Sequence, residues 1–197
     1  MITIYGDPIS GNCLKVKWTA QRLGIPFTWI DVDVVKRETR TPQFLAINPA
    51  GQVPTVVLAD GRPLAQSNAI ILTLAEGSAL IPSDPYERAK MLEWLFWEQY
   101  SHEPYVAVVR FRVKFQGKAR EELDPGLIAG AEAALRRLEA ALAGRPYLVG
   151  EALSLADICL VGYTRFAADG GFSLADYPAV DAWVARLEAE LPIKEPR

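Results

Sequence analysis

Asn48-Pro-Ala-Gly-Gln-Val-Pro-Thr55 leads directly into a short, mostly β-branched run, residues 55–58, and the first part of the chain is organised around this junction. Branched side chains bounded by turn residues are typical of a strand. The Asp60-Gly61 pair that follows is a strong turn signal, and residues 63–65 supply a returning strand. The stretch therefore predicts a β-hairpin that is entered through a proline.

The two ends of this hairpin suit a small, extended, anionic peptide. Pro54 stands at the start of the leading strand, where its missing N–H costs least, and an X-Pro bond is also a site for a cis peptide. A cis Val53–Pro54 bond would turn the N–H and C=O of Val53 outward, where they can pair with another peptide backbone. Beyond the hairpin, Ser67 is placed to cap a predicted helix over residues 68–76. The N–H groups of such a helix start favour a carboxylate.

The residues before the hairpin predict the rest of a mixed α/β layer. Apolar residues recur at helical spacing over residues 11–23, and a glycine follows where a helix commonly ends. Thr41 and Pro42 have the cap and first-turn positions of a short helix. Strands are expected at residues 2–5 and 27–34. The resulting order, βαβ-α-ββα, is compatible with a thioredoxin-like layer of mixed sheet covered by helices.

Proline and serine occur within residues 80–85, which is typical of a loop, and every later segment has the pattern of a helix. The expected helices are one long helix or a pair over residues 86–116, then helices that begin at Pro125, Ser154 and Pro178. Asp157 has the position of a capping-box acid, so we interpret it as a helix-start residue rather than a catalytic acid. The chain is predicted to form a domain over residues 1–78, a linker over 79–85 and a helical domain over 86–197.

Asn-Pro-x-Gly-Gln-Val-Pro at residues 48–54 and Gln-Ser-Asn-Ala-Ile at residues 66–70 together resemble the glutathione-binding half of the cytosolic glutathione transferase family. The resemblance covers essentially the whole chain. It implies an α+β, thioredoxin-like N-terminal domain followed by an all-α helical-bundle domain, with glutathione as co-substrate. It also implies that Val53, before a cis Pro54, pairs with the cysteinyl backbone of glutathione. Gln66 and Ser67 would hold the γ-glutamyl carboxylate.

Three polar residues near this region bear on the binding of glutathione, and two of them, Gln52 and Arg40, have two interpretations each. Gln66 stands where many family members carry Glu, and an amide accepts from the ammonium group of glutathione without the charge-assisted contribution. Gln52 is placed to reach the glycine end of glutathione, with a plain loop amide as the alternative. Arg40 is either a partner for the same carboxylate or a solvated surface arginine.

Ser10-Gly11-Asn12-Cys13 lies at the junction of the first strand and the first helix, where a helix start lowers the cost of a nearby anion. Cys13 falls on the apolar side of the helix and is expected to be buried and inert. Ser10 is a helix cap or, as in serine-dependent family members, the donor that stabilises the glutathione thiolate. The run is also similar to Thr-Pro-Asn-Gly-His-Lys-Val of some bacterial members, which implies Asn12 as a competing donor.

The composition excludes several classes of site and partner. A net charge of −3 gives no basic surface for a nucleic acid, and no apolar run is long enough to span a bilayer. Two distant cysteines and a single histidine do not indicate a disulfide framework or a metal site. The start of the chain lacks the basic and long apolar regions of a secretory signal, so a cytoplasmic protein is expected.

The combined expectation is a glutathione transferase in which the glutathione thiolate attacks a small hydrophobic electrophile beside the long helix. The alternatives are a glutathione-dependent reductase of peroxides or disulfides, favoured if Asn12 rather than Ser10 controls the sulfur, and a non-catalytic binding module.

Residues 91–96 are apolar on more than one face, as in a helix central to a larger core or one shared with a second copy. Family members are usually dimers, so the resemblance implies a homodimer.

Overall fold

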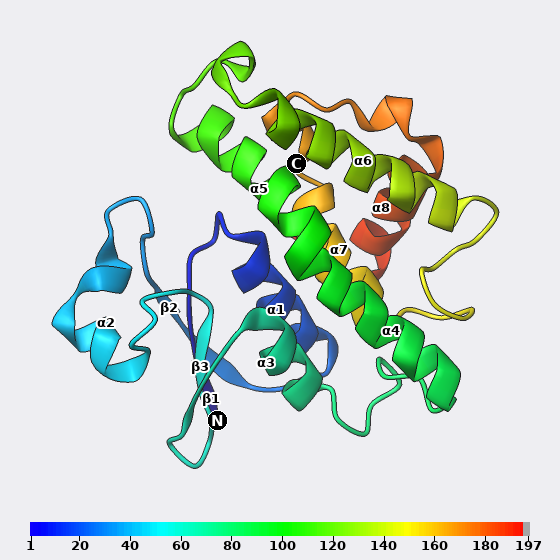
Figure 1. Ribbon diagram of the computed structural model, residues 1–197. Coiled ribbons are helices and arrows are strands. Elements are labelled where there is room, and N and C mark those ends of the chain that lie inside the picture. Colours follow the sequence, from blue (N-terminus) through cyan, green and yellow to red (C-terminus); the bar gives the residue numbers. More distant parts are fainter. Residues whose placement is uncertain (195–197) are drawn as a thin grey trace. The chain divides into compact units, whose positions relative to one another are not determined.

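The computed structural model describes residues 1–194 and divides the chain into two compact units, Met1–Ser78 and a second that begins at Ala79 (Figure 1). The residues expected as a linker carry buried Leu80 and Ile81, and the carbonyl of Leu80 accepts from the N–H of Leu155 at 3.0 Å. Leu80 is therefore bonded to the start of the helix at Leu155, whereas Ser83, Asp84 and Pro85 are exposed.

The first unit has the predicted order βαβ-α-ββα, a thioredoxin-like arrangement. Its elements are β1 (Ile2–Gly6), α1 (Gly11–Arg22), β2 (Phe27–Asp31), α2 (Pro42–Ile47), β3 (Thr55–Val57), β4 (Pro63–Ala65) and α3 (Ser67–Leu74), with a 3-10 turn at Glu38–Arg40. The second strand is shorter than predicted. After Asp31, the N–H of Val32 still donates to the carbonyl of Gly6 at 3.0 Å, but the N–H of Val34 donates to the carboxylate of Asp7 at 2.8 Å, so the pairing with β1 does not continue to Val34.

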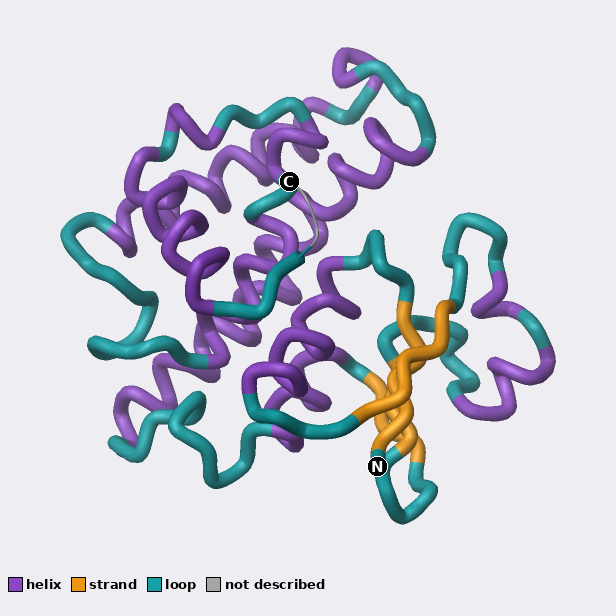
Figure 2. Tube along the Cα trace, turned by 180° about the vertical axis from the view of Figure 1, so that it is seen from behind, coloured by secondary structure: helices purple, strands orange, loops and turns teal. Residues whose placement is uncertain are grey.

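The four strands form one mixed sheet in the order β2-β1-β3-β4, seen edge-on in Figure 2. Strands β1 and β2 run parallel, whereas β3 is antiparallel to both β1 and β4. Helices α1 and α3 pack against each other on one side of the sheet, and α2 lies beyond the other side (Figures 1 and 2). Leu14, Val16 and Trp18 of α1 are fully buried in this layer.

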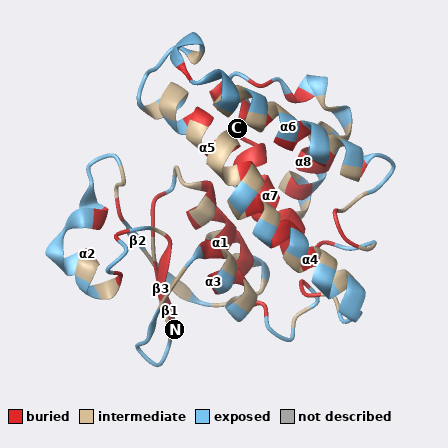
Figure 3. Ribbon diagram, in the orientation of Figure 1, coloured by how far each residue is buried: buried red, intermediate tan, exposed pale blue. Residues whose placement is uncertain are grey.

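The second unit is helical throughout. Its helices are α4 (Pro85–Trp97), α5 (Glu103–Arg110), α6 (Pro125–Leu142), α7 (Leu155–Thr164) and α8 (Pro178–Glu190). Short 3-10 turns lie at Arg120–Glu122, Ala167–Gly170 and Leu174–Asp176. Helix α7 is buried along its whole length and packs against α4, α5 and α8 (Figure 3). The predicted helix starts at Pro125, Ser154 and Pro178 are confirmed, and Ser154 and Asp157 form the predicted capping box.

The predicted long helix widens twice into π-helical turns, at Glu98–His102 and Phe111–Phe115. The first of these precedes Pro104, which lies in the first turn of α5 and has no N–H to donate. Here the N–H of Glu103 reaches back five residues to the carbonyl of Glu98. A π-helical turn is a known way to accommodate such an interruption without ending the helix.

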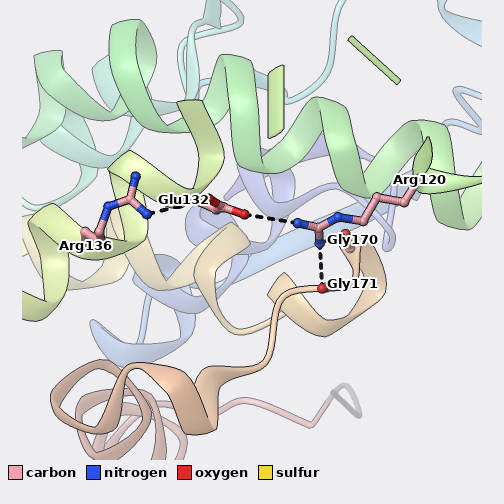
Figure 4. A network of polar contacts seen from close by, with 5 residues as sticks. All are labelled: Arg120, Glu132, Arg136, Gly170 and Gly171. Atoms are coloured by element: carbon pink, nitrogen blue, oxygen red, sulfur yellow. Dashed lines mark hydrogen bonds and ion pairs between the residues drawn. The ribbon is translucent and has the colours of Figure 1, made fainter. Parts of the chain in front are cut away.

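Arg120 ties the segment before α6 to the turn after α7 (Figure 4). Its Nη1 donates to the carbonyls of Gly170 and Gly171 at 3.2 and 2.6 Å, and its Nη2 lies 3.3 Å from Glu132. Glu132 also pairs with Arg136 at 3.5 Å. This network is internal to the second unit and accounts for these charges without a ligand.

Among the described residues, no helix is both long enough and apolar enough to cross a membrane.

Candidate functional site

The sheet register brings three predicted segments to one place. Tyr5 lies opposite Thr55, and Thr55 lies opposite Ala65. Because these neighbouring strands are antiparallel, the end of β1, the start of β3 and the end of β4 meet at one edge of the sheet. The start of α1, the Val53–Pro54 bond and the start of α3 follow or precede those strand ends directly.

Ser10 is the N-cap of α1, as one of its two interpretations predicts. Its Oγ accepts from the N–H of Cys13 at 3.4 Å, and its own N–H donates to the carbonyl of Asp7 at 3.0 Å. The buried Asp7 carboxylate accepts from the N–H groups of Ile9 and Val34, which fixes the loop between β1 and α1. Capping uses the hydroxyl oxygen as an acceptor, and donation of the hydroxyl hydrogen is a separate capacity.

Cys13 is fully buried, which confirms the expectation of an inert thiol. Burial raises the pKa of this thiol to about 12, and the hydrogen bond with Ser10 offsets only part of that rise. The thiolate, not the thiol, is the nucleophile. Cys13 therefore carries no nucleophile at neutral pH, and any reactive sulfur at this helix start has to come from a ligand.

The Val53–Pro54 peptide bond is cis, as predicted. Neither the N–H nor the C=O of Val53 forms a hydrogen bond within residues 1–194. Pro54 itself is buried, whereas Val53 is half-buried at the surface of the loop. A backbone donor and acceptor of a half-buried residue thus form no hydrogen bond within this part of the chain, and such groups are the ones with which an extended peptide can pair.

The side chain of Asn48 stabilises the loop that holds the Val53–Pro54 bond, a role that was not predicted from the sequence. Its buried side-chain amide donates to the carbonyl of Gln52 at 2.9 Å and to Oγ1 of Thr55 at 3.0 Å, and its oxygen accepts from the N–H of Ala50 at 3.1 Å. One side chain therefore spans both sides of the cis bond. The signal for it was present in the Asn-Pro that opens the stretch, because asparagine commonly bonds to the backbone two residues on.

The prediction that Ser67 caps α3 is wrong. The helix begins at Ser67, and the cap position belongs to Gln66, whose backbone has φ 70° and ψ 107° and whose side chain makes no capping bond. A positive φ is uncommon for a residue other than glycine and is found often at functional sites. It shifts the helix start by one residue, so the Ser67 hydroxyl is turned away from the cap.

The Ser67 hydroxyl donates instead to Oδ1 of Asn12 at 3.1 Å. The first turns of α3 and α1 are therefore joined directly, and two of the predicted site residues touch. With its oxygen facing Ser67, the Asn12 side chain presents its amide nitrogen, a donor, in another direction. This contact joins residues that are 55 positions apart, so no local pattern could reveal it.

Arg40 and Gln52 lie at the loop of the cis bond. Nη1 of Arg40 donates to the carbonyl of Ala50 at 3.4 Å, and the guanidinium lies over Gly51. A Cβ at Gly51 would come within 2.6 Å of that nitrogen. The Gln52 side chain is exposed, and its backbone carbonyl accepts from Asn48. The Arg40 side chain is thus held against this loop, whereas Gln52 is held there by its backbone alone.

Two of the polar residues of the long helix are engaged within the second unit. Nε2 of His102 lies 2.9 Å from Oγ1 of Thr164, and Nε of Arg110 lies 3.0 Å from Asp169. Both side chains are buried. Within residues 1–194, no group of three or more histidine, cysteine or acidic side chains could hold a metal ion.

A cavity of about 390 Å³ lies elsewhere in the first unit, between β2 and α2. Its lining residues are Tyr5, Ile30, Asp31, Val32, Glu38, Thr41, Gln43, Phe44 and Ile47. None of these is among the predicted site residues. The cavity therefore lies on the α2 side of the sheet, and Tyr5 is the lining residue that also stands at the edge where β1 ends and β3 begins.

Comparison with known families gives two matches on this chain. Residues 9–76 match the glutathione S-transferase N-terminal domain, and residues 96–190 match the glutathione S-transferase C-terminal domain. A crystal structure of glutathione S-transferase from Pseudomonas fluorescens Pf-5 is 45% identical, with a TM-score of 0.91, and the match covers 95% of this chain and 94% of that one.

Two further relatives carry information on ligands and activity. The disulfide-bond oxidoreductase YfcG of Escherichia coli is 32% identical over 96% of this chain and 91% of its own. A glutathione transferase from Burkholderia graminis, solved with two glutathione molecules bound per subunit, is 27% identical with a TM-score of 0.83. That match covers 95% of this chain and 83% of the other.

Proposed function

The chain belongs to the glutathione S-transferase family, and from this premise we propose that it binds glutathione and activates the thiol as a thiolate for attack on a small hydrophobic electrophile. The observation that carries the proposal is the meeting of three elements at one sheet edge: the start of α1, the cis Val53–Pro54 bond and the start of α3. Each supplies the kind of group that a different part of an acidic tripeptide needs.

In this proposal the backbone N–H and C=O of Val53 pair with the cysteinyl residue of glutathione. Gln66 and Ser67 hold the γ-glutamyl end at the start of α3, where N–H groups and the helix dipole favour a carboxylate. Gln52 lies beside this backbone, at the glycine end. A related structure with bound glutathione supports a tripeptide of this kind as the ligand.

Ser10 is then the donor to the glutathione sulfur. It stands at the start of α1, and its capping bond uses only its oxygen as an acceptor. A donor to the thiolate stabilises the charged form and lowers the pKa of the bound thiol. The enzyme would supply a preorganised donor and the position, while the nucleophile would belong to glutathione.

The second candidate function is glutathione-dependent reduction of disulfides or peroxides. It is favoured by Asn12, whose amide nitrogen is oriented as a donor by the bond from Ser67, and by the relative YfcG, a disulfide-bond oxidoreductase. In that reaction the same glutathione thiolate attacks a sulfur or oxygen of the substrate. A non-catalytic binding module remains the third alternative.

Glutathione is expected to raise the thermal unfolding midpoint of the protein, because a ligand that binds only the folded state stabilises it by mass action. At a concentration 100 times Kd, this amounts to about 2.7 kcal/mol. The measurement is a thermal scan with increasing glutathione. The control peptide is cysteinylglycine, which lacks the γ-glutamyl group of glutathione. An unchanged midpoint at millimolar glutathione would reject both enzymatic functions and favour the non-catalytic module.

We also propose a homodimer, formed through the second unit. Phe96 and Tyr100 are 75% and 84% exposed, and Tyr86 on the same side of this helix is 72% exposed. Of the predicted segment 91–96, Met91, Trp94 and Leu95 are buried, which leaves Phe96 for a partner. Aligned exposed aromatic side chains are characteristic of protein interfaces.

The double variant Phe96→Asp/Tyr100→Asp is expected to sediment as a monomer at a micromolar concentration at which the unchanged protein sediments as a dimer. Two carboxylates on the facing surfaces would have to be desolvated on association. Val35→Asp, a change at an exposed apolar residue of the first unit, is the matched control and should leave the dimer intact. A monomeric unchanged protein would contradict the proposal.

A further inference from the structure

The peptide unit between Gln52 and Val53 is held by two buried side chains. The carbonyl of Gln52 accepts from Nδ2 of Asn48 at 2.9 Å and from Oγ1 of Thr55 at 3.0 Å. Thr55 is fully buried at the start of β3, and Asn48 is only 6% exposed. Because a carbonyl oxygen has two lone pairs, these two donors use its whole capacity.

The direction of each hydrogen bond in this network is determined. Thr55 gives its only hydroxyl hydrogen to the Gln52 carbonyl, so its oxygen is the acceptor of the 3.0 Å bond from Asn48. Asn48 thereby uses both hydrogens of its amide, and its oxygen accepts from the N–H of Ala50 at 3.1 Å. A buried polar network whose members are all satisfied makes the backbone that it holds rigid.

The rigid peptide plane carries this constraint to the N–H of Val53. A trans peptide unit is planar, and its C=O and N–H point in opposite directions. Within residues 1–194 only the Val53–Pro54 bond is cis, so the Gln52–Val53 unit is trans. The N–H of Val53 is therefore directed away from Asn48 and Thr55. The C=O of Val53 belongs to the next peptide unit, so these two side chains orient the donor of Val53 and not its acceptor.

We propose that Asn48 and Thr55 are positioning residues of the glutathione site: by holding the Gln52 carbonyl, they direct the N–H of Val53 at the cysteinyl carbonyl of the bound tripeptide. The inference rests on the proposed function, because that tripeptide is glutathione. Neither side chain touches the ligand. Their contribution is preorganisation, since a loop that is already ordered loses less conformational freedom when the peptide binds.

Thr55→Val tests this role, because valine has the shape of threonine without the hydroxyl. The change removes the bond to the Gln52 carbonyl and the acceptor for Asn48. S-methylglutathione, which has no thiol, is the ligand, and titration calorimetry measures its affinity. We expect binding to weaken roughly threefold to tenfold, which is the size of effect of one neutral hydrogen bond. Thr55→Ser restores the hydroxyl and should recover most of the affinity.

The pKa of the bound glutathione thiol separates this role from an effect on the sulfur. It is measured by titration of the ultraviolet thiolate absorbance of the complex. Since Val53 pairs with the peptide backbone of glutathione, Thr55→Val should leave this pKa at its wild-type value while the affinity falls. A shifted pKa with unchanged affinity would contradict the proposed role.

Thr19→Val is the matched control. Thr19 is also fully buried in the first unit, and its hydroxyl donates to the carbonyl of Lys15 at 2.7 Å. The same chemical change here should leave the affinity for S-methylglutathione unchanged. Wild-type affinity in Thr55→Val, or an equal loss in Thr19→Val, would overturn the inference and leave the proposed function intact. A wild-type protein that does not bind S-methylglutathione would overturn both.

Hydrogen exchange of the Val53 amide is a second measurement, and it needs no variant. This N–H forms no hydrogen bond within residues 1–194, so its exchange should slow when S-methylglutathione saturates the protein. The amide of Gly61 already donates to the carbonyl of Leu58 in the hairpin turn and should exchange at the same rate with and without the ligand. Unchanged exchange of Val53 in the saturated complex would overturn the inference, and this result decides should Thr55→Val not fold.

Discussion

Replacement of Asp157 by alanine is expected to destabilise the second unit by about 3–5 kcal/mol. Asp157 is fully buried at the start of α7. Its Oδ1 accepts from the N–H of Leu148 at 3.0 Å and from Nε1 of Trp183 at 2.9 Å, while its Oδ2 accepts from the N–H and hydroxyl of Ser154. Alanine would leave these donors buried without their acceptor, and an unsatisfied buried donor costs about 1–3 kcal/mol.

The free energy of unfolding from denaturant titrations measures this effect. Asp157→Asn keeps one oxygen acceptor and should lose less than Asp157→Ala. Glu151→Ala, at an exposed acid in the preceding loop, is the control and should change stability by less than about 0.5 kcal/mol. A loss below about 1 kcal/mol in Asp157→Ala would contradict the structural role of this carboxylate, since that is the cost of a single ordinary hydrogen bond.

Ser10→Ala is expected to lower the rate of glutathione transfer at neutral pH by roughly one to two orders of magnitude. The change removes a charge-assisted hydrogen bond to the thiolate, of about 1.5–3 kcal/mol. Each pKa unit corresponds to about 1.36 kcal/mol, so the pKa of the bound thiol should rise by about one to two units. The sign is upward because the lost donor stabilised the charged form only. The rate should partly recover at alkaline pH, where the thiolate forms without help.

Two companion variants sharpen this test. Ser10→Thr keeps the hydroxyl and the helix cap, so it should retain most of the activity. Asn12→Ala removes the acceptor of Ser67, so it should weaken glutathione binding more than it shifts the pKa of the thiol. The opposite pattern, in which Asn12→Ala shifts the titration and Ser10→Ala leaves it in place, would overturn the Ser10 assignment and favour the reductase.

Features with a local cause were predictable from the sequence. Ser10 and Thr41 cap their helices, Val53–Pro54 is cis, and Asp157 completes a capping box, since each depends on a side chain and its near neighbours. Pro104 is likewise a readable signal for the interruption of the long helix, because a proline within a helical pattern removes one donor. The family resemblance identified the fold as a whole.

What the sequence could not reveal depends on distant residues or on a single backbone angle. The bonds from Ser67 to Asn12 and from Lys15 to Asn68 join residues 55 and 53 positions apart. The positive φ of Gln66 is set by the turn from β4 into α3, and it moved the helix start from the predicted residue. The identity of the electrophile depends on a pocket whose shape no local pattern encodes.

Titration of the ultraviolet absorbance of the wild-type complex tests most directly whether this protein converts bound glutathione to its thiolate. An ordinary cysteine thiol has a pKa of about 8.5. We expect the thiol of bound glutathione to titrate at least one unit lower, with the thiolate band present at neutral pH and lost on addition of excess S-methylglutathione. A bound thiol that titrates at the same pH as free glutathione would contradict the claim.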